Sequence, residues 1–137
     1  MNTGREPLTN EDDAAPVEML AQLFEAHGWP CEFVSDDEIS GEIQGSWAKY
    51  QMRAIWRVED RVLQLLCLPE IRVADAKRAD AFELLGLINE QLWLGHFDIW
   101  SRGGVLLYRH GLMLGEDGLL SLSMAQIAIE AAVSECD

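Results

Sequence analysis

The chain has 137 residues, of which 49% are hydrophobic, and this composition is sufficient for the core of one globular domain. Its 24 acidic and 10 basic side chains give a formal net charge of -14, which disfavours binding to nucleic acid or to an anionic membrane surface. Because no window holds the roughly 18 apolar residues of a membrane span, and residues 1–8 lack the pattern of a signal peptide, we expect a cytoplasmic protein.

The basic side chains are concentrated in the middle of the chain. Residues 1–45 carry a formal charge of -10, residues 46–78 carry +3 and residues 79–137 carry -7. Such a basic island either neutralises neighbouring acidic residues or receives an acidic partner segment. The three cysteines are widely spaced, which favours reduced thiols in the core over a disulfide framework or a zinc site.

Residues 1–15 mix Asn, Thr, Gly and Pro with a run of acidic residues, so we expect a flexible leader ahead of one domain spanning residues 16–137. A short amphipathic helix follows the leader. Its apolar residues recur at helical spacing at Val17, Leu20, Ala21 and Phe24, and Gly28 stands where a helix C-cap is expected.

Two strands are expected after this helix. Residues 31–34 predict a short strand, and residues 38–43 alternate so that Ile39, Gly41 and Ile43 share one face. The acidic turn between the strands lacks the alternating carboxylates of a calcium-binding loop, so it is interpreted as a solvated turn.

Residues 50–58 show the clearest strand pattern of the chain, and a tight turn at residues 59 and 60 leads into another strand at residues 61–68. If the loop is those two residues, each core-facing side chain meets an apolar partner across the strands. The predicted pairs are Trp56 with Leu63, Ala54 with Leu65 and Met52 with Cys67.

The opposite face of this hairpin is mixed in character. One interpretation is an outer face whose aliphatic side chains lie under arginine stems or a covering helix. The other is a surface where apolar contacts supply affinity and arginines select an acidic or carboxylate-bearing partner. The residues that would contact a protein or peptide partner are Arg53, Ile55, Arg57 and Leu66.

A long helix is expected between an N-cap at Asp75 and a stop at Gly95, and it carries two apolar stripes. The principal stripe consists of Ala81, Leu84, Leu85, Ile88 and Leu92. The second stripe consists of Phe82, Gly86, Asn89 and Trp93. If the first stripe packs on the sheet, the second stripe must be covered by another helix of the chain or by the same helix of a second copy. The residues of the second stripe are therefore candidate dimer contacts. A glycine inside a helix costs about 1 kcal/mol, which suggests close approach of another backbone. Asn89 either caps a neighbouring backbone group, specifies register in that contact or lies on the surface.

Gly103 and Gly104 predict the next hairpin, and a two-residue loop would pair Ile99 with Tyr108, Phe97 with His110 and Asp98 with Arg109. His96, Asp98 and His110 are the nearest approach to an acid–base group. Alternation points His96 and Asp98 to one face and His110 to the other, so we expect structural histidines. No nucleophile elbow or phosphate-binding loop is recognised, and no catalytic residue, metal ligand or cofactor is assigned.

A capping box at Ser123 and Gln126 predicts a final helix whose apolar face is Ile127, Ala128, Ala131 and Ala132. The element order is then helix, three strands, helix, two strands, helix. Tight connections between the strands indicate an α+β domain with an antiparallel sheet of about five strands.

Four segments carry a resemblance to a known family: GWPCEFVSDDEISGEIQG, YQMRAIWRVEDRVLQLLCLP, LGLINEQLWLGHFDIW and GVLLYRHGLML. The chain resembles the YbjN-domain family, described as bacterial sensory transduction regulators, over roughly residues 16–136. The resemblance implies a fold similar to type III secretion chaperones, a non-enzymatic role and a tendency to dimerise. Asn89, Gly95 and Phe97 match the family's Asn, Gly and Phe, for which it implies a structural role.

Three functional hypotheses follow. The leading one is a dimeric, non-enzymatic, protein-binding or chaperone-like regulator. The second is a sensor that holds a small molecule between sheet and helix, and the third is an enzyme that uses His96 or His110.

Overall fold

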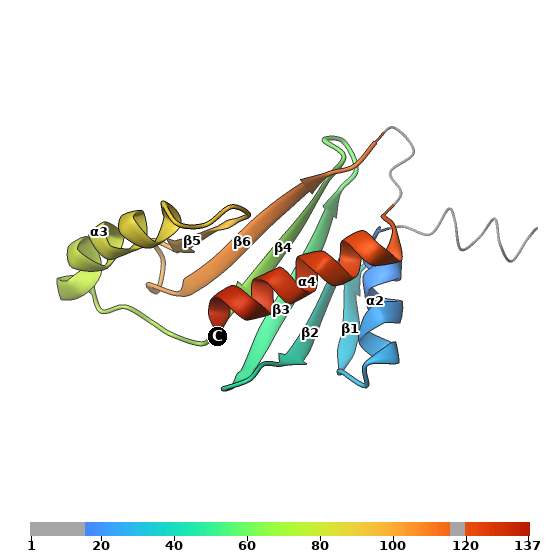
Figure 1. The fold of residues 1–137 in the computed structure, drawn as a ribbon, viewed down its shortest axis with the longest axis horizontal. Coiled ribbons are helices and arrows are strands. Elements are labelled where there is room, and N and C mark those ends of the chain that lie inside the picture. The colour runs from blue at the N-terminus through green and yellow to red at the C-terminus, as the bar shows by residue number, and fades with distance from the viewer. Residues whose placement is uncertain (1–15, 116–119) are drawn as a thin grey trace, which may run out of the picture.

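The computed structural model describes residues 16–115 and 120–137, which form a six-stranded antiparallel sheet with helices packed against it (Figure 1). The predicted leader, residues 1–15, lies outside the described residues. In chain order the elements are α2 (Pro16–Ala26), β1 (Cys31–Ser35), β2 (Glu38–Gln44), β3 (Lys49–Arg57), β4 (Val62–Leu68), the 3-10 turn η1 (Asp75–Lys77), α3 (Arg78–Asn89), β5 (His96–Ile99), β6 (Leu106–Met113) and α4 (Leu122–Cys136).

The α+β class and the antiparallel sheet are confirmed. The sheet has six strands where about five were expected: all four segments predicted as strands between residues 31 and 68 form strands before α3, whereas the expected element order counted three there. Its order is β1-β2-β3-β4-β6-β5, so β1 and β5 are the two edges. Figure 1 shows α2 beside β1 and α3 beside β5, at opposite ends of the sheet.

The predicted register of the β3–β4 hairpin is confirmed. Met52 lies opposite Cys67, and the other two predicted pairs also form. Alternating side chains of β3 are buried, and β4 places its own apolar side chains across from them, so a slip of one residue would move both sets to the wrong face.

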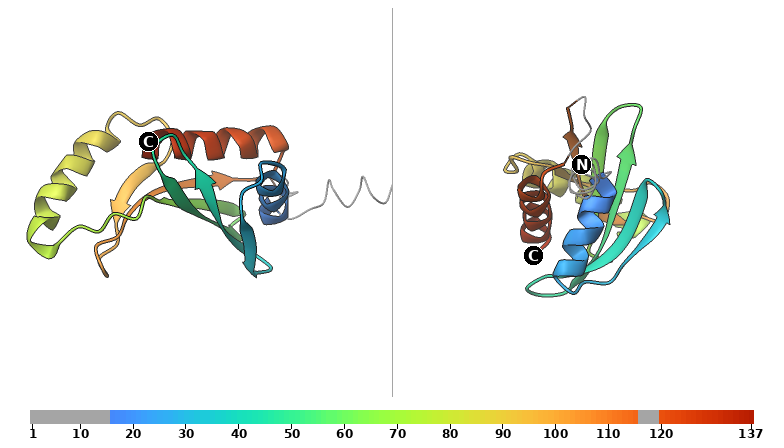
Figure 2. Two further views of the ribbon diagram at one scale, coloured as in Figure 1. Left: turned by 90° about the horizontal axis from the view of Figure 1, so that it is seen from below. Right: turned by 90° about the vertical axis from the view of Figure 1, so that its right-hand side faces the viewer.

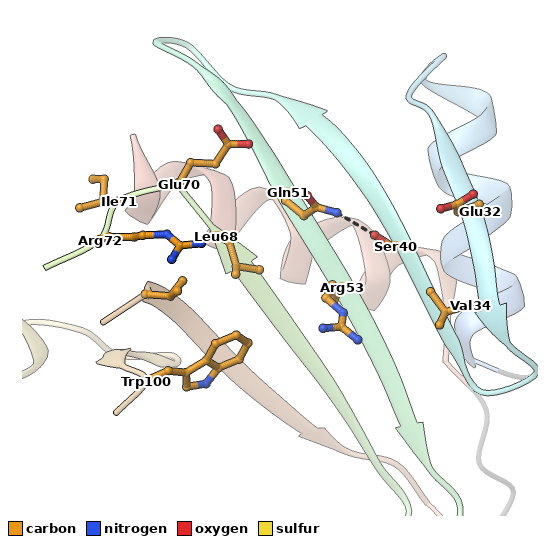
Figure 3. A pocket seen from close by; sticks show the side chains of 11 residues that line it. Glu32, Val34, Ser40, Gln51, Arg53, Leu68, Glu70, Ile71, Arg72 and Trp100 are labelled. Carbon is orange, nitrogen blue, oxygen red and sulfur yellow. Dashed lines mark hydrogen bonds between the residues drawn. The ribbon is translucent and has the colours of Figure 1, made fainter. Parts of the chain in front are cut away.

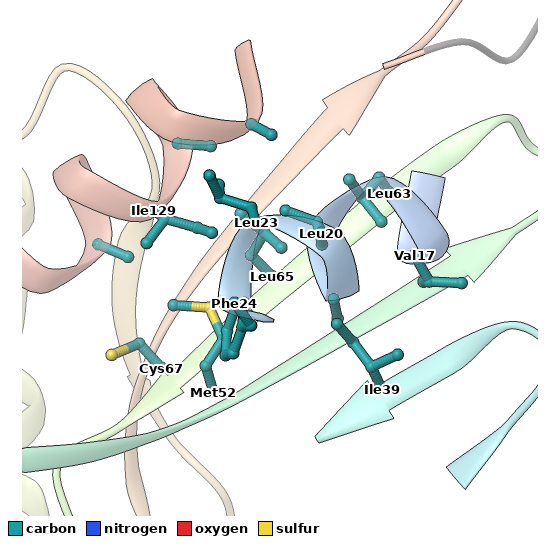
Figure 4. Close-up of a cluster of buried hydrophobic side chains, with 14 of the residues drawn as sticks. Val17, Leu20, Leu23, Phe24, Ile39, Met52, Leu63, Leu65, Cys67 and Ile129 are labelled. Carbon is teal, nitrogen blue, oxygen red and sulfur yellow. The ribbon is translucent and has the colours of Figure 1, made fainter. Parts of the chain in front are cut away.

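One face of the sheet packs against α2 and α4, which lie on the same side of it (Figure 2). The predicted helix at α2 is confirmed, with Val17, Leu20 and Phe24 buried. Gly41 lets α2 approach β2 closely, because a Cβ there would stand 2.5 Å from the Phe24 ring. Figure 4 shows the resulting core, which α2, α4 and the inner residues of β2, β3 and β4 share.

The predicted register of the β5–β6 hairpin is wrong by two residues. Phe97 lies opposite Tyr108 and Asp98 opposite Leu107. The connection is longer than the expected two residues: Trp100 N donates to Val105 O at 3.0 Å, and Gly103 and Gly104 occupy the end of the turn with φ of 80° and 65°. A shift of two residues leaves every side chain on its predicted face.

The last helix begins earlier than predicted. Its N-cap is Ser121, whose hydroxyl accepts from Met124 N at 3.1 Å, so the predicted capping box at Ser123 and Gln126 is wrong. The buried side consists of Ala125, Ala128, Ile129 and Ala132, whereas Ile127 is 57% exposed. None of the helices in the described part of the chain has the length and apolar character needed to cross a membrane.

Candidate functional site

The face of the sheet turned away from α2 and α4, here called the open face, carries Arg53 and Arg57 of the basic island and Arg109 of β6. Arg53 of β3 forms an ion pair with Glu38 of β2, and Arg57 pairs with Asp60 at 3.0 Å. Arg109 of β6 lies 3.8 Å from Asp98. Arg53 and Arg57 therefore neutralise acidic neighbours within the chain, one of the two roles expected of the basic island.

The four predicted partner-contact residues lie on this open face, but they are not equally accessible. Leu66 lies between Arg53 on β3 and Arg109 on β6, and it is only 5% exposed. Ile55 is half-buried, whereas the Arg57 side chain is 61% exposed. Leu66 thus belongs to the floor of the face, while Arg57 is available at the hairpin end of β3.

A hollow of about 680 Å³ lies on the other half of the open face (Figure 3). Leu68, Ile71, Val105, Val34 and Trp100 supply its apolar side chains, and α4 lies behind the sheet in this view. Gln51 spans two strands by donating to the Ser40 hydroxyl at 2.8 Å. Arg53 and Arg72 also line the hollow, with Glu32 and Glu70 at its rim.

Arg72 differs from the strand arginines because it makes no ion pair with any residue in the described ranges. It reaches the hollow because β4 is followed by Glu70 with φ of 65°, after which the chain pairs again with the start of β6 through Arg72 and Val105. Sequence reasoning missed Arg72 and Trp100. The only local signal was the break at Leu68-Pro69, which does not reveal that the chain returns to the sheet.

The second unusual surface is α3 with the loop that follows it. Only Leu85 of α3 is buried. The expectation that the principal stripe packs on the sheet is wrong for Leu84, which is 57% exposed, and for Ile88, which is 36% exposed. Within the described chain α3 packs mainly on the short edge strand β5, so most of its apolar circumference has nothing to cover it.

The predicted dimer contacts fall in different environments on this surface. Phe82 is 45% exposed, and a Cβ on Gly86 would meet no atom within 4 Å. Trp93 is 98% exposed and lies beyond the end of α3. Asn89 is engaged within the chain, because its side-chain amide bonds to the backbone of Phe97. Of the roles expected for Asn89, the structure shows the capping of a backbone group.

Two other residues of the family pattern are also structural here. Gly95 has φ of 70°, and a Cβ there would stand 2.4 Å from the Tyr108 hydroxyl. That hydroxyl donates to Leu94 O at 2.7 Å, while the Tyr108 ring packs edge-on against Phe97 with centroids 5.4 Å apart. This contact ties the segment after α3 to β6, the strand next to the edge strand β5.

The histidines do not converge on a common site. His96 pairs with Arg109 across the strands, which places it on the face opposite to His110. Burial lowers the pKa of the His110 imidazole and so favours its neutral form. No cluster of three metal-ligating side chains occurs among the residues with described positions.

Comparison with known families gives one match. A family model, YbjN, with the description "Putative bacterial sensory transduction regulator", matches residues 16–137. None of the curated proteins matches the chain.

Proposed function

Since the chain belongs to the YbjN family, we propose that it is a cytoplasmic regulator that acts by binding protein, as a homodimer, and not by catalysis. The observation that carries this proposal is the exposed apolar surface of α3 and the loop after it. The cytoplasmic location is supported by three cysteines that are free thiols, as suits a reducing compartment.

Several large apolar side chains of α3 and of the loop after it are exposed to solvent. Phe82, Leu84, Leu87, Trp93 and Leu94 are between 45% and 98% exposed. Scattered apolar side chains are normal on a protein surface, but Leu84 and Leu87 lie one turn apart on the same side of α3, and exposed apolar neighbours of this kind support an interaction site. A helix of 12 residues with one buried side chain also gains little stability from its own chain, so a partner that covers it stabilises it.

A second copy is the simplest partner for this surface. Closed two-fold dimers are the commonest assemblies of soluble proteins, and an apolar helix face is a usual contact in them. Such a dimer leaves the hairpin end of the open face, with Ile55 and Arg57, free for a protein or peptide partner with an acidic character. A chaperone-like role would use the same free surface.

A small-molecule sensor is the second candidate, and the hollow on the open face favours it. Its volume of about 680 Å³ is within the usual range of ligand pockets. The predicted location between sheet and helices is not where this hollow lies, so the ligand would contact Trp100 and Arg72 instead. Titration of small carboxylic acids against the fluorescence of wild type and Trp100→Phe separates this candidate from a protein-binding role.

Light scattering during size-exclusion chromatography tests the main proposal. We expect wild type to elute with twice the chain mass of 15.4 kDa and Leu84→Glu/Leu87→Glu to elute as a monomer. Met124→Glu/Ile127→Glu is the matched control, because these α4 residues have the same spacing and are 42% and 57% exposed. A monomeric wild type at high concentration, or a dimeric α3 variant, would overturn the proposal.

A further inference from the structure

Two of the three cysteines meet on the side of the sheet that α4 covers. Cys67 of β4 is fully buried in the core that Figure 4 shows. Cys136, the last residue of α4, is partly exposed and packs against the same core. A hydrogen bond with the Cys136 thiol, together with burial, raises the pKa of the Cys67 thiol. The two sulfurs are therefore neighbours, although their residues lie far apart in the sequence.

Two buried tyrosines place Cys136 over the same part of the sheet. Tyr108 lies directly across from Cys67 on β6, and Tyr50 lies diagonally across from it on β3. The Tyr50 hydroxyl donates to Cys136 O at 3.3 Å. The helix α4 also packs on β4 and β6. The last turn of α4 is thus held above the strand position that carries Cys67.

We propose that Cys67 and Cys136 are a redox site, at which hydrogen peroxide oxidises the two thiols to a disulfide that joins the end of α4 to β4. This inference goes beyond the proposed homodimer and does not depend on it. It gives the protein a chemical signal, a peroxide, that changes a covalent bond inside the fold.

The different exposure of the two thiols sets the order of the reaction. Peroxide reaches the partly exposed Cys136 first, because thiol oxidation follows access from solvent. The Cys136 sulfur attacks one peroxide oxygen and the O–O bond breaks. The products are a sulfenic acid on Cys136 and one water, which takes the thiol proton.

Cys67 is the thiol that resolves this intermediate. Its sulfur attacks the Cys136 sulfur, the S–O bond breaks, and the departing hydroxide takes the Cys67 proton and leaves as a second water. The two thiols lose two electrons in total, and these electrons reduce the peroxide. Because Cys67 is buried, it meets the sulfenic acid beside it rather than peroxide from solvent.

The disulfide should make the fold more resistant to unfolding. It would close a loop that contains α3, β5 and β6, and a crosslink between residues far apart in the sequence restricts the unfolded chain. It would also hold the last turn of α4, where helices tend to fray. Reduction by a thiol reagent restores both cysteines, so the change is reversible.

Treatment of the full chain with a few molar equivalents of hydrogen peroxide tests the proposal. We expect the intact mass to fall by that of two hydrogen atoms, and peptide mapping to find Cys67 joined to Cys136 within one chain. The Tm should rise by at least about 5 °C and return to its starting value with dithiothreitol. The α3 variant Leu84→Glu/Leu87→Glu should form the same disulfide, which separates this result from the test of the homodimer.

Substitution of each cysteine supplies the controls. Cys136→Ser, at a partly exposed position, and Cys67→Ala should both lose the Tm response, and in Cys67→Ala the sulfenic acid of Cys136 should persist and react with dimedone. Cys31→Ser should respond like wild type, because Cys31 lies on β1, three inter-strand spacings or about 14 Å from β4. The proposal is wrong if peroxide leaves all three thiols of wild type free, or if the crosslink contains Cys31 or joins two chains.

Discussion

The side-chain amide of Asn89 forms two hydrogen bonds with the backbone of Phe97. Its Oδ1 accepts from Phe97 N at 2.8 Å, and its Nδ2 donates to Phe97 O at 3.1 Å. Because β5 is an edge strand, this amide occupies the place that the peptide of a neighbouring strand would take. The last residue of α3 thus holds the helix to the sheet and closes part of its edge.

Asn89→Ala should lower the free energy of unfolding by about 1–3 kcal/mol, because it leaves the N–H and C=O of Phe97 without partners in a half-buried place. Urea denaturation measures the loss. Gln91→Ala, at an exposed position two residues on, is the control and should change stability by less than about 0.5 kcal/mol. Equal stability of the two variants would show that the hydrogen bonds of the Asn89 side chain do not stabilise the fold.

Gly41→Ala should destabilise the fold by about 1–3 kcal/mol, because its Cβ would stand 2.5 Å from the Phe24 ring and 2.8 Å from Pro30 O. Thermal unfolding reads out the effect. Gly86→Ala is the comparison: its Cβ meets nothing within 4 Å, and it should stabilise the α3 helix by up to about 1 kcal/mol in the monomer. A neutral Gly41→Ala would mean that α2 does not pack this closely on β2.

The stability of the protein should depend on His110 at mildly acidic pH. Burial lowers the folded-state pKa of this histidine, so the unfolded chain binds its proton more readily. The contribution is fully present above the unfolded pKa of about 6.5 and is lost as pH falls below it. Urea unfolding at pH 7.5 and 5.5 should show a larger loss for wild type than for His110→Leu. Identical losses of stability in the two proteins would indicate that protonation of the His110 imidazole does not destabilise the fold.

Both tyrosines should ionise at a higher pH than an ordinary tyrosine. A hydrogen bond to Asp137, at 2.5 Å, and burial raise the pKa of Tyr50 to about 12, and burial raises the pKa of Tyr108 to about 12. Absorbance at the phenolate band should therefore change little as pH passes 10. Asp137→Ala should lower the pKa of Tyr50 and leave that of Tyr108 in place. Ionisation of both phenols near pH 10 in the folded protein would contradict the described contacts.

The register of a hairpin was predictable where the alternation of apolar and polar residues in both of its strands allows only one pairing. In the β3–β4 hairpin, an apolar residue of one strand meets an apolar residue of the other at every core position, so only one register satisfies both strands. In the β5–β6 hairpin, a shift of two residues keeps Phe97 and Tyr108 on the core face, so the pattern did not distinguish the registers. The length of the turn between β5 and β6 sets the register instead.

The candidate site was less predictable because it depends on tertiary placement. Leu84 and Leu85 are neighbours of the same type, yet one is exposed and the other buried, since α3 touches only the sheet edge. An apolar residue reserved for a partner has the same sequence pattern as one reserved for the core. Arg72 and Trp100 belong to different segments, and only the pairing of the chain after Glu70 with β6 brings them to one hollow.

Hydrogen exchange of α3 at two protein concentrations tests the central claim most directly. In the monomer this helix has one buried side chain, so its backbone amides should exchange quickly. If α3 is the surface through which two copies bind, the amides of residues 82–89 should exchange much more slowly at high concentration than at low concentration, while those of α2 stay unchanged. Equal exchange of α3 at both concentrations would contradict the account.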